Sequence, residues 1–266
     1  MFNVLEIPAF VGMTIFRGAL NLFMSIPRFY SASALAAGIP IELSSTAAHH
    51  AANVLRLRPG AALILFDGRG GEYSATLERV EKKLVLAQVQ SHFPLERESP
   101  LAVRLVQALS ARDRMDTTLQ KAVELGVAHI VPVISQRSVV RLSGERADNR
   151  IAHWQQVAIS ACEQCGRNRV PQVEPIVSLT TFLERPPSNM SRWMLAPHAE
   201  QVLRSLAKPP ATVELLVGPE GGLTPEEERA AAHAGFISVR IGPRILRTET
   251  AAPALLAAMQ ALWGDF

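Results

Sequence analysis

The chain has 266 residues, of which 48% are hydrophobic and 19% are charged, a balance that suits a globular protein with a buried core. The same balance excludes an intrinsically disordered chain. The net charge is only +3, although a pI of about 9.2 is compatible with a basic surface patch. Two cysteines are too few for a disulfide framework, so we expect a reducing, cytoplasmic location.

The first 23 residues differ in composition from the rest of the chain. They are apolar, but Glu6, Pro8 and Arg17 interrupt any run long enough to span a bilayer. A secretory signal needs an early positive charge, whereas the first charge here is Glu6. We expect Met24 to be the initiator and residues 1–23 to be a dispensable extension that is not translated. An amphipathic surface helix is the alternative interpretation.

Residues 24–95 show short apolar runs broken by turns. AALILF (61–66) leads into a glycine-rich turn, which is followed by EYSATLERV (72–80) and KLVLAQVQ (83–90). This strand–turn–strand pattern and its spacing indicate a small β-barrel. Its arginines are candidate phosphate contacts, although exposed arginines are usually only solvated. They are Arg28, Arg56, Arg58 and Arg69.

Strand-like and helix-like segments alternate beyond residue 100. The charged segment SHFPLERESP (91–100) contains two prolines and is interpreted as a linker. The alternation favours an α/β fold in which helices cover both faces of a parallel sheet. The expected strands are 101–109, 129–135, 192–197, 214–218 and 236–241, and the expected helices are 115–127, 150–165 and 251–263.

The stretch LLVGPEGGLTPEE (215–227) predicts a strand, a glycine turn and a helix. Its spacing fits neither a P-loop nor a GxGxxG fingerprint. Thr224, Pro225 and Glu227 form an N-cap, a first-turn proline and a capping box. Because glutamates occupy the start of this helix and Glu220 lies in the turn, we expect a neutral or cationic ligand rather than a phosphate. An ordinary turn without a ligand is the alternative.

A second glycine turn, IGPRILRTETA (241–251), follows another expected strand. Ligands of open parallel sheets bind at the carboxyl ends of strands, so we expect the two turns to meet at one site. Guanidinium groups suit phosphates, so arginines beside an acidic turn indicate a nucleic-acid substrate with a cationic cosubstrate. The arginines concerned form three clusters, Arg137 with Arg141, Arg167 with Arg169, and Arg244 with Arg247.

Other chemistry has little support in the sequence. Cys162 and Cys165 form a CxxC, but a structural zinc needs four ligands and no second pair exists. A redox pair normally opens a helix, whereas this one closes a helix. The histidines lack metal-ligand spacing, and no Gly-x-Ser-x-Gly elbow suggests a hydrolase. We therefore expect no metal site.

Four motifs together resemble a known family: QKAVELGV, ACEQCGRNRVP, GPEGGLTPEE and IGPRILRTETA. From Met24 to the terminal WGDF, the chain resembles the ribosomal RNA small-subunit methyltransferase E family. The resemblance implies a homodimer that uses S-adenosylmethionine to methylate N3 of a uridine in small-subunit (16S) ribosomal RNA. It also implies a PUA-like RNA-binding β-barrel at 24–95 and a SPOUT methyltransferase domain at 96–266 with a C-terminal trefoil knot.

The resemblance also implies roles for individual residues. Arg247 would stabilise negative charge on the uracil carbonyls, and Glu249 is the nearest motif carboxylate that could take the N3 proton. A hydrogen-bonding role within the knot is the alternative for Glu249. The expected cofactor-binding residues are Leu195, Gly218, Glu220, Gly221, Ile241, Gly242 and Leu246. The expected RNA-binding residues are Arg28, Arg56, Arg69, Arg137 and Arg167.

Two alternative functions remain at this stage. One is a ribose 2′-O RNA methyltransferase of the same fold. Those enzymes usually carry a Ser-Leu-Asn motif in the last turn, where this chain has Arg-Thr-Glu-Thr. The other is a non-catalytic RNA-binding protein of ribosome assembly, in which an intact cosubstrate turn would have little use.

Overall fold

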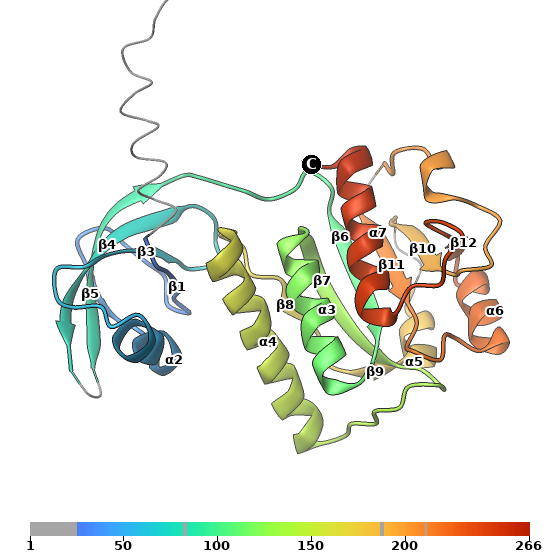
Figure 1. Cartoon of the computed structure of the whole chain (residues 1–266), viewed down its shortest axis with the longest axis horizontal. Coiled ribbons are helices and arrows are strands. Elements are labelled where there is room, and N and C mark those ends of the chain that lie inside the picture. Colours follow the sequence, from blue (N-terminus) through green and yellow to red (C-terminus); the bar gives the residue numbers. More distant parts are fainter. Residues whose placement is uncertain (1–25, 82–83, 187–188, 211) are drawn as a thin grey trace, which may run out of the picture. The chain divides into compact units, whose positions relative to one another are not determined.

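The computed structural model describes residues 26–81, 84–186, 189–210 and 212–266 (Figure 1). The chain forms two compact units that divide between Leu95 and Glu96. The expected N-terminal extension, residues 1–23, lies outside the described residues. Within the described ranges, no helix is both long enough and apolar enough to cross a bilayer.

The first unit, drawn in blue to cyan in Figure 1, is built on a β-sheet. The sheet has five strands in the order β1-β3-β4-β5-β2. β1 runs parallel to β3, and the other neighbouring strands are antiparallel. The expected strand–turn–strand pattern is confirmed, and β5 extends three residues beyond Gln90 to Phe93. The strands are β1 (Arg28–Tyr30), β2 (Pro40–Glu42), β3 (Ala62–Phe66), β4 (Glu72–Val80) and β5 (Val85–Phe93).

The turn between β3 and β4 depends on glycine. Gly71 has φ +70°, and a Cβ at this position would lie 2.8 Å from the backbone oxygen of Phe93. Only glycine avoids both the strain and the clash. Two short helices, α2 (Ser45–His49) and η1 (His50–Val54), complete the unit and pack small side chains against the strand residues of its core.

The second unit is an α/β fold with a seven-stranded parallel sheet, in the order β12-β10-β11-β6-β7-β8 with β9 also on β7. The expected parallel sheet is therefore confirmed. Its strands are β6 (Val103–Ala108), β7 (Val127–Ile134), β8 (Gln172–Val173), β9 (Val177–Ser178), β10 (Ser191–Leu195), β11 (Val213–Val217) and β12 (Ile237–Val239).

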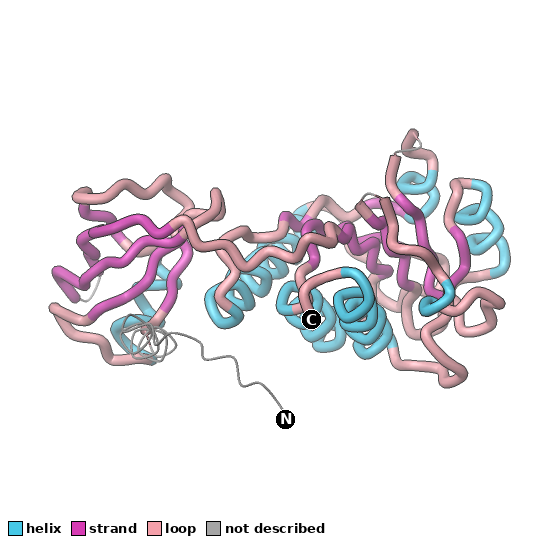
Figure 2. Tube along the Cα trace, turned by 90° about the horizontal axis from the view of Figure 1, so that it is seen from above, coloured by secondary structure: helices cyan, strands magenta, loops and turns pink. Residues whose placement is uncertain are grey.

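Helices cover both faces of this sheet, as Figure 2 shows. α3 packs against α4 and α7 on one face, where the rings of Trp193 and Trp263 lie 5.5 Å apart. On the other face, α5 and α6 bury Phe182 and Ala231 against strand residues such as Val106 and Leu216. The helices are α3 (Arg112–Glu124), α4 (Glu145–Cys165), α5 (Leu179–Leu183), α6 (Pro225–His233) and α7 (Thr248–Trp263), with a 3-10 turn, η2 (Leu203–Ser205).

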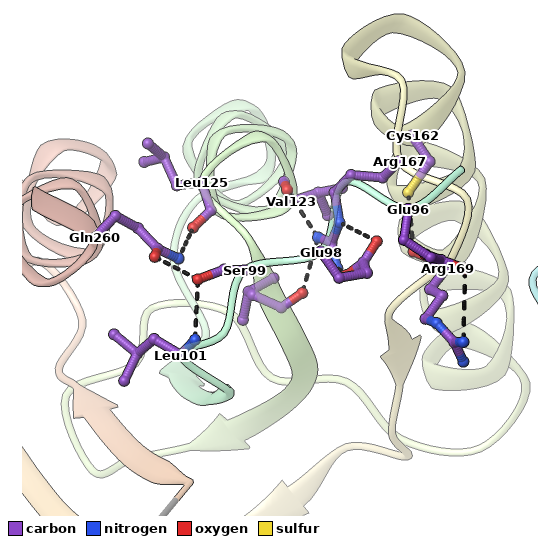
Figure 3. Close-up of polar contacts among 11 residues, drawn as sticks. Glu96, Glu98, Ser99, Leu101, Val123, Leu125, Cys162, Arg167, Arg169 and Gln260 are labelled. Atoms are coloured by element: carbon purple, nitrogen blue, oxygen red, sulfur yellow. Dashed lines mark hydrogen bonds and ion pairs between the residues drawn. The ribbon is translucent and has the colours of Figure 1, made fainter. Parts of the chain in front are cut away.

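Residues 96–100, the second half of the expected linker, are bound to the second unit (Figure 3). The Glu98 carboxylate accepts hydrogen bonds of 3.1 and 2.5 Å from Arg167. Ser99 Oγ donates to Gln260 Oε1 over 2.6 Å, and Gln260 Nε2 donates to the backbone oxygen of Leu125 over 2.8 Å. The first residues of this unit are therefore fixed to the carboxyl-terminal ends of α3 and α7.

Candidate cofactor pocket and its rim

A pocket of about 670 Å³ opens at the carboxyl ends of β10, β11 and β12. Leu195 ends β10, Val217 ends β11, and Arg240 follows β12. Because these strands are parallel, their carboxyl ends lie at one edge of the sheet. Both glycine turns line the pocket, so the prediction that they meet at one site is confirmed.

The turn after β11 is closely packed. A Cβ at Gly218 would lie 3.3 Å from both the side chain and the backbone nitrogen of Leu223, and Gly222 has φ +68°. Thr224 Oγ1 accepts a hydrogen bond from the backbone nitrogen of Glu227, and the Glu227 carboxylate accepts one from the backbone nitrogen of Thr224. The predicted capping box is thus confirmed, with Pro225 at the first helical position.

Arg137 supports the same turn from outside. Its NH1 group donates hydrogen bonds to the backbone oxygens of Gly221 and Leu223, over 3.0 and 3.1 Å. A Cβ at Gly221 would lie 3.3 Å from the Arg137 side chain, so this contact leaves little room for a larger residue. Arg137 is exposed and lines the pocket, so it lies at the rim of the candidate site.

Arg114 joins the two turns electrostatically. Its NH1 group donates to Glu220 Oε1 over 3.1 Å, and its Nε lies 3.9 Å from Glu249 Oε2. Burial opposes ionisation of Glu220, but hydrogen bonds from the backbone nitrogen of Ala111 and from Arg114 outweigh it and hold the pKa of Glu220 below its usual value. The buried Glu249 Oε2 accepts no hydrogen bond from the described residues.

Sequence reasoning missed Arg114. A usable signal was present, because the RDRMD segment lies just beyond the carboxyl end of an expected strand, where ligands of a parallel sheet bind. Nothing in the local pattern shows that this arginine meets two carboxylates that lie more than 100 residues further along the chain.

All the residues expected to bind cofactor or to act in catalysis line this single pocket. The structure brings them together from three separate parts of the chain, and their individual roles remain predictions. The residues are Leu195, Gly218, Glu220, Gly221, Ile241, Gly242, Leu246, Arg247 and Glu249.

The expected RNA-binding arginines of the first unit differ in how far their side chains are exposed to solvent. Arg56 and Arg69 are exposed. The side chain of Arg28 is only 10% exposed, forms a 2.5 Å ion pair with Glu72 and lies 5.1 Å from the centre of the Phe66 ring. This placement contradicts the expected RNA contact of Arg28, because its guanidinium group is held within the unit.

Arg167 also requires a correction (Figure 3). The residue is 4% exposed, and besides its pair with Glu98 it donates to the backbone oxygens of Val123 and Val127, over 2.8 and 2.9 Å. A buried guanidinium group whose donors are used in this way cannot reach a phosphate. The expected RNA contact of Arg167 is therefore wrong, and the residue instead holds together the segments around the end of α4.

The CxxC pair lies beside this cluster. Cys162 is buried, and its Sγ lies 3.6 Å from the backbone oxygen of Arg169. Burial raises the pKa of the Cys165 thiol, which disfavours the reactive thiolate at neutral pH. Among the residues that the structure describes, no three His, Cys, Asp or Glu side chains are grouped to hold a metal ion.

Family models define the class of protein. Residues 97–260 match an RNA methyltransferase domain, and residues 43–90 match an RNA methyltransferase PUA domain. Proteins named ribosomal RNA small subunit methyltransferase E are similar along most of their length. The one from Buchnera aphidicola is 31% identical over 91% of this chain and 95% of its own, and the one from Mycobacterium tuberculosis is 33% identical over 80% and 83%. The chain belongs to the ribosomal RNA small subunit methyltransferase E family, which confirms the resemblance of its motifs.

Solved structures agree with this assignment. A ribosomal RNA small subunit methyltransferase E from Neisseria gonorrhoeae, bound to S-adenosyl methionine, is 47% identical and has a TM-score of 0.87 over 91% of this chain and 99% of that one. A putative methyltransferase from Legionella pneumophila, in complex with SAM, is 39% identical. Its TM-score is also 0.87, over 91% of this chain and 99% of that one.

Proposed function

We propose that this protein uses S-adenosylmethionine to methylate N3 of a uridine in small-subunit (16S) ribosomal RNA. The observation that carries the proposal is the pocket formed by the two glycine turns, in a chain whose 47% identical relative is solved with S-adenosyl methionine bound. Relatives of the chain are named for small-subunit ribosomal RNA.

The residues of the pocket fit this cofactor. Leu195, Ile241 and Leu246 supply apolar surface for an adenine ring. At Gly242 an added Cβ would meet no protein atom within 4 Å, so a ligand can approach the backbone closely. The Glu220 carboxylate, which is paired with Arg114, supplies a negative charge that suits a sulfonium. When bound, the cofactor supplies an electrophilic methyl group.

The protein must orient the uracil and assist the loss of its N3 proton. Glu249 is proposed to take this proton, because its side chain lines the pocket and is 23% exposed. Arg247 directly precedes α7 and is exposed at the pocket. It is proposed to stabilise the negative charge that develops on the uracil carbonyl oxygens.

We also propose that residues 24–95 form a PUA-like RNA-binding β-barrel and that residues 96–266 form a SPOUT domain with a C-terminal trefoil knot. The PUA family match and the exposed Arg56 and Arg69 support the first assignment. The convergence of segments near residues 195, 218 and 242 on the start of α7 supports the second. If the chain is knotted, stretching it by both ends should give a shorter final length than its residue count allows.

One set of experiments tests the reaction. Small subunits from a strain lacking the methyltransferase are incubated with the protein and S-adenosylmethionine, and modified nucleotides are identified by mass spectrometry. We expect one N3-methyluridine per small subunit. A 2′-O-methyl product would favour the ribose methyltransferase. Binding of S-adenosylhomocysteine in calorimetry without any product would favour cofactor binding without catalysis, and absence of both would favour a non-catalytic assembly protein. We also propose the homodimer that the family resemblance implies, and sedimentation of the isolated protein tests it.

A further inference from the structure

A second cavity, of about 410 Å³, is lined by Ala111, Asp113, Arg114, Val139 and Glu220. Arg114 and Glu220 also line the cofactor pocket, so the two cavities share a wall. That wall is the Arg114–Glu220 ion pair, whose carboxylate is fixed by the backbone nitrogen of Ala111 over 3.0 Å. A molecule in the second cavity would therefore lie next to a molecule in the first.

We propose that the second cavity holds the uracil ring of the target uridine and that Arg114 contacts its carbonyl oxygens. The inference rests on the proposed uridine N3 methylation. An acceptor atom must lie in line with the methyl group it receives, so its binding site must adjoin the cofactor pocket. The two cavities adjoin at Arg114 and Glu220. The Arg114 side chain is 43% exposed, so it can move from between the cavities onto a carbonyl oxygen and let the ring edge face the cofactor pocket.

The chemistry of Arg114 suits uracil. N3 lies between two carbonyl groups, and an arginine presents five N–H donors in a planar fork. Among the described contacts, Arg114 donates one hydrogen bond, to Glu220, which leaves donors for a carbonyl oxygen. When the N3–H bond breaks, the proton passes to the Glu249 carboxylate, and the electron pair stays on N3 and spreads to both carbonyls. The guanidinium group then faces the developing charge.

The other lining groups favour a neutral ring over a phosphate. Asp113 and Glu220 bring two carboxylates against the single charge of Arg114, so the cavity repels an anion. Val139 is apolar and 72% exposed, and it offers a surface on which the face of a base can pack. Thus the base itself, rather than the backbone of the RNA, is the part that this cavity accepts.

Val139→Trp tests the cavity without altering the cofactor pocket, because Val139 lines the second cavity and not the cofactor pocket. The substitution fills the space for the base at an exposed position, so folding is preserved. We expect the affinity for S-adenosylhomocysteine in calorimetry to stay within about threefold of the wild type. The single-turnover rate of methylation should fall by about 100-fold or more. Thr180→Trp, at an exposed position of α5 that lines neither cavity, is the matched control and should methylate normally.

Arg114→Gln tests the contact with the base. We expect kcat to fall by about 100-fold, with little change in the KM for small subunits, and Arg114→Lys to recover part of the rate. Wild-type methylation by Val139→Trp would overturn the cavity assignment, and wild-type kcat in Arg114→Gln would overturn the contact. Failure of the wild-type protein to form N3-methyluridine would instead reject the proposed function, so the two failures can be told apart.

Discussion

Thr248 donates a hydrogen bond from Oγ1 to the backbone oxygen of Gly218 over 3.2 Å, across 30 residues of chain. Thr248 is the first residue of α7 and is 5% exposed, and Gly218 begins the turn after β11. The bond joins the two turns that form the cofactor pocket. The position of α7 therefore helps to determine the shape of the pocket.

Thr248→Val should therefore lower both stability and cofactor affinity. The substitution keeps the shape of the side chain but leaves the Gly218 oxygen without its donor, a loss of about 1–3 kcal/mol in the free energy of unfolding. Urea titration measures this change. Thr250→Val, at an exposed position on the same helix, makes the same chemical change and should stay within about 0.5 kcal/mol of wild type. Equal losses in the two variants would contradict the assigned role of the bond.

Glycines of the pocket should be required for cofactor binding. Gly218→Val places a branched side chain against the backbone of Leu223 and should abolish binding of S-adenosylhomocysteine. Gly242→Ala is the more specific probe, because its Cβ meets no protein atom within 4 Å. A tenfold or greater loss of affinity, about 1.4 kcal/mol, with unchanged stability would place the ligand at this backbone. Calorimetry that finds wild-type affinity in both variants would locate the cofactor elsewhere.

Arg167 and Arg169 should differ sharply in their effect on stability. Arg167→Ala leaves Glu98 and two backbone oxygens without their donor, and we expect a loss of about 3–5 kcal/mol in the free energy of unfolding. Arg169 is exposed and lies 3.6 Å from Glu96, so Arg169→Ala should cost about 1 kcal/mol or less. Chemical denaturation compares the two, and a small loss for Arg167→Ala would show that the buried cluster is dispensable.

Glu220 should contribute to stability in a pH-dependent way. Burial disfavours the ionised form of Glu220, but the hydrogen bonds from Ala111 and Arg114 stabilise that form more strongly. The folded-state pKa of Glu220 therefore lies below the unfolded value. Its contribution is complete at pH values above the unfolded pKa and is lost as the pH falls through the folded pKa. The stability difference between wild type and Glu220→Gln should thus shrink on acidification below about pH 4.5. A difference that is constant from neutral to strongly acidic pH would refute this linkage.

We expect RNA binding and catalysis to depend on different arginines. Arg69→Ala should weaken binding of small-subunit RNA and reduce the slope of log affinity against log salt by about 0.7–0.9, as expected for one lost phosphate contact. Arg79→Ala is the control, because Arg79 is an exposed arginine of the same unit whose charge is already paired with Glu81 at 3.7 Å. We expect this variant to bind RNA like the wild type. Arg247→Ala should lower the single-turnover rate with only a modest change in affinity. Transfer at the wild-type rate by Arg247→Ala would remove its catalytic role.

The order of strands and helices in the second unit could be predicted from the sequence, since periodicity and capping residues act within a few positions. The helix boundaries were less accurate. α7 begins at Thr248 rather than Ala251, and α4 begins at Glu145 rather than Arg150, because their first turns are polar and the apolar stripe starts later. The five-residue helix α5 and the two-residue strands β8 and β9 are too short for any period to be visible.

The sequence by itself determined the two glycine turns, the capping box and the motifs of the family, because each is written in a few neighbouring residues. Only the tertiary structure decided what each arginine does. Arg167 and Arg169 lie two positions apart in one motif, yet one is buried against Glu98 and the other is exposed. Arg114 meets Glu220 across 106 residues of chain. Burial and ion pairing depend on which distant segments the sheet brings together, and no local pattern encodes that.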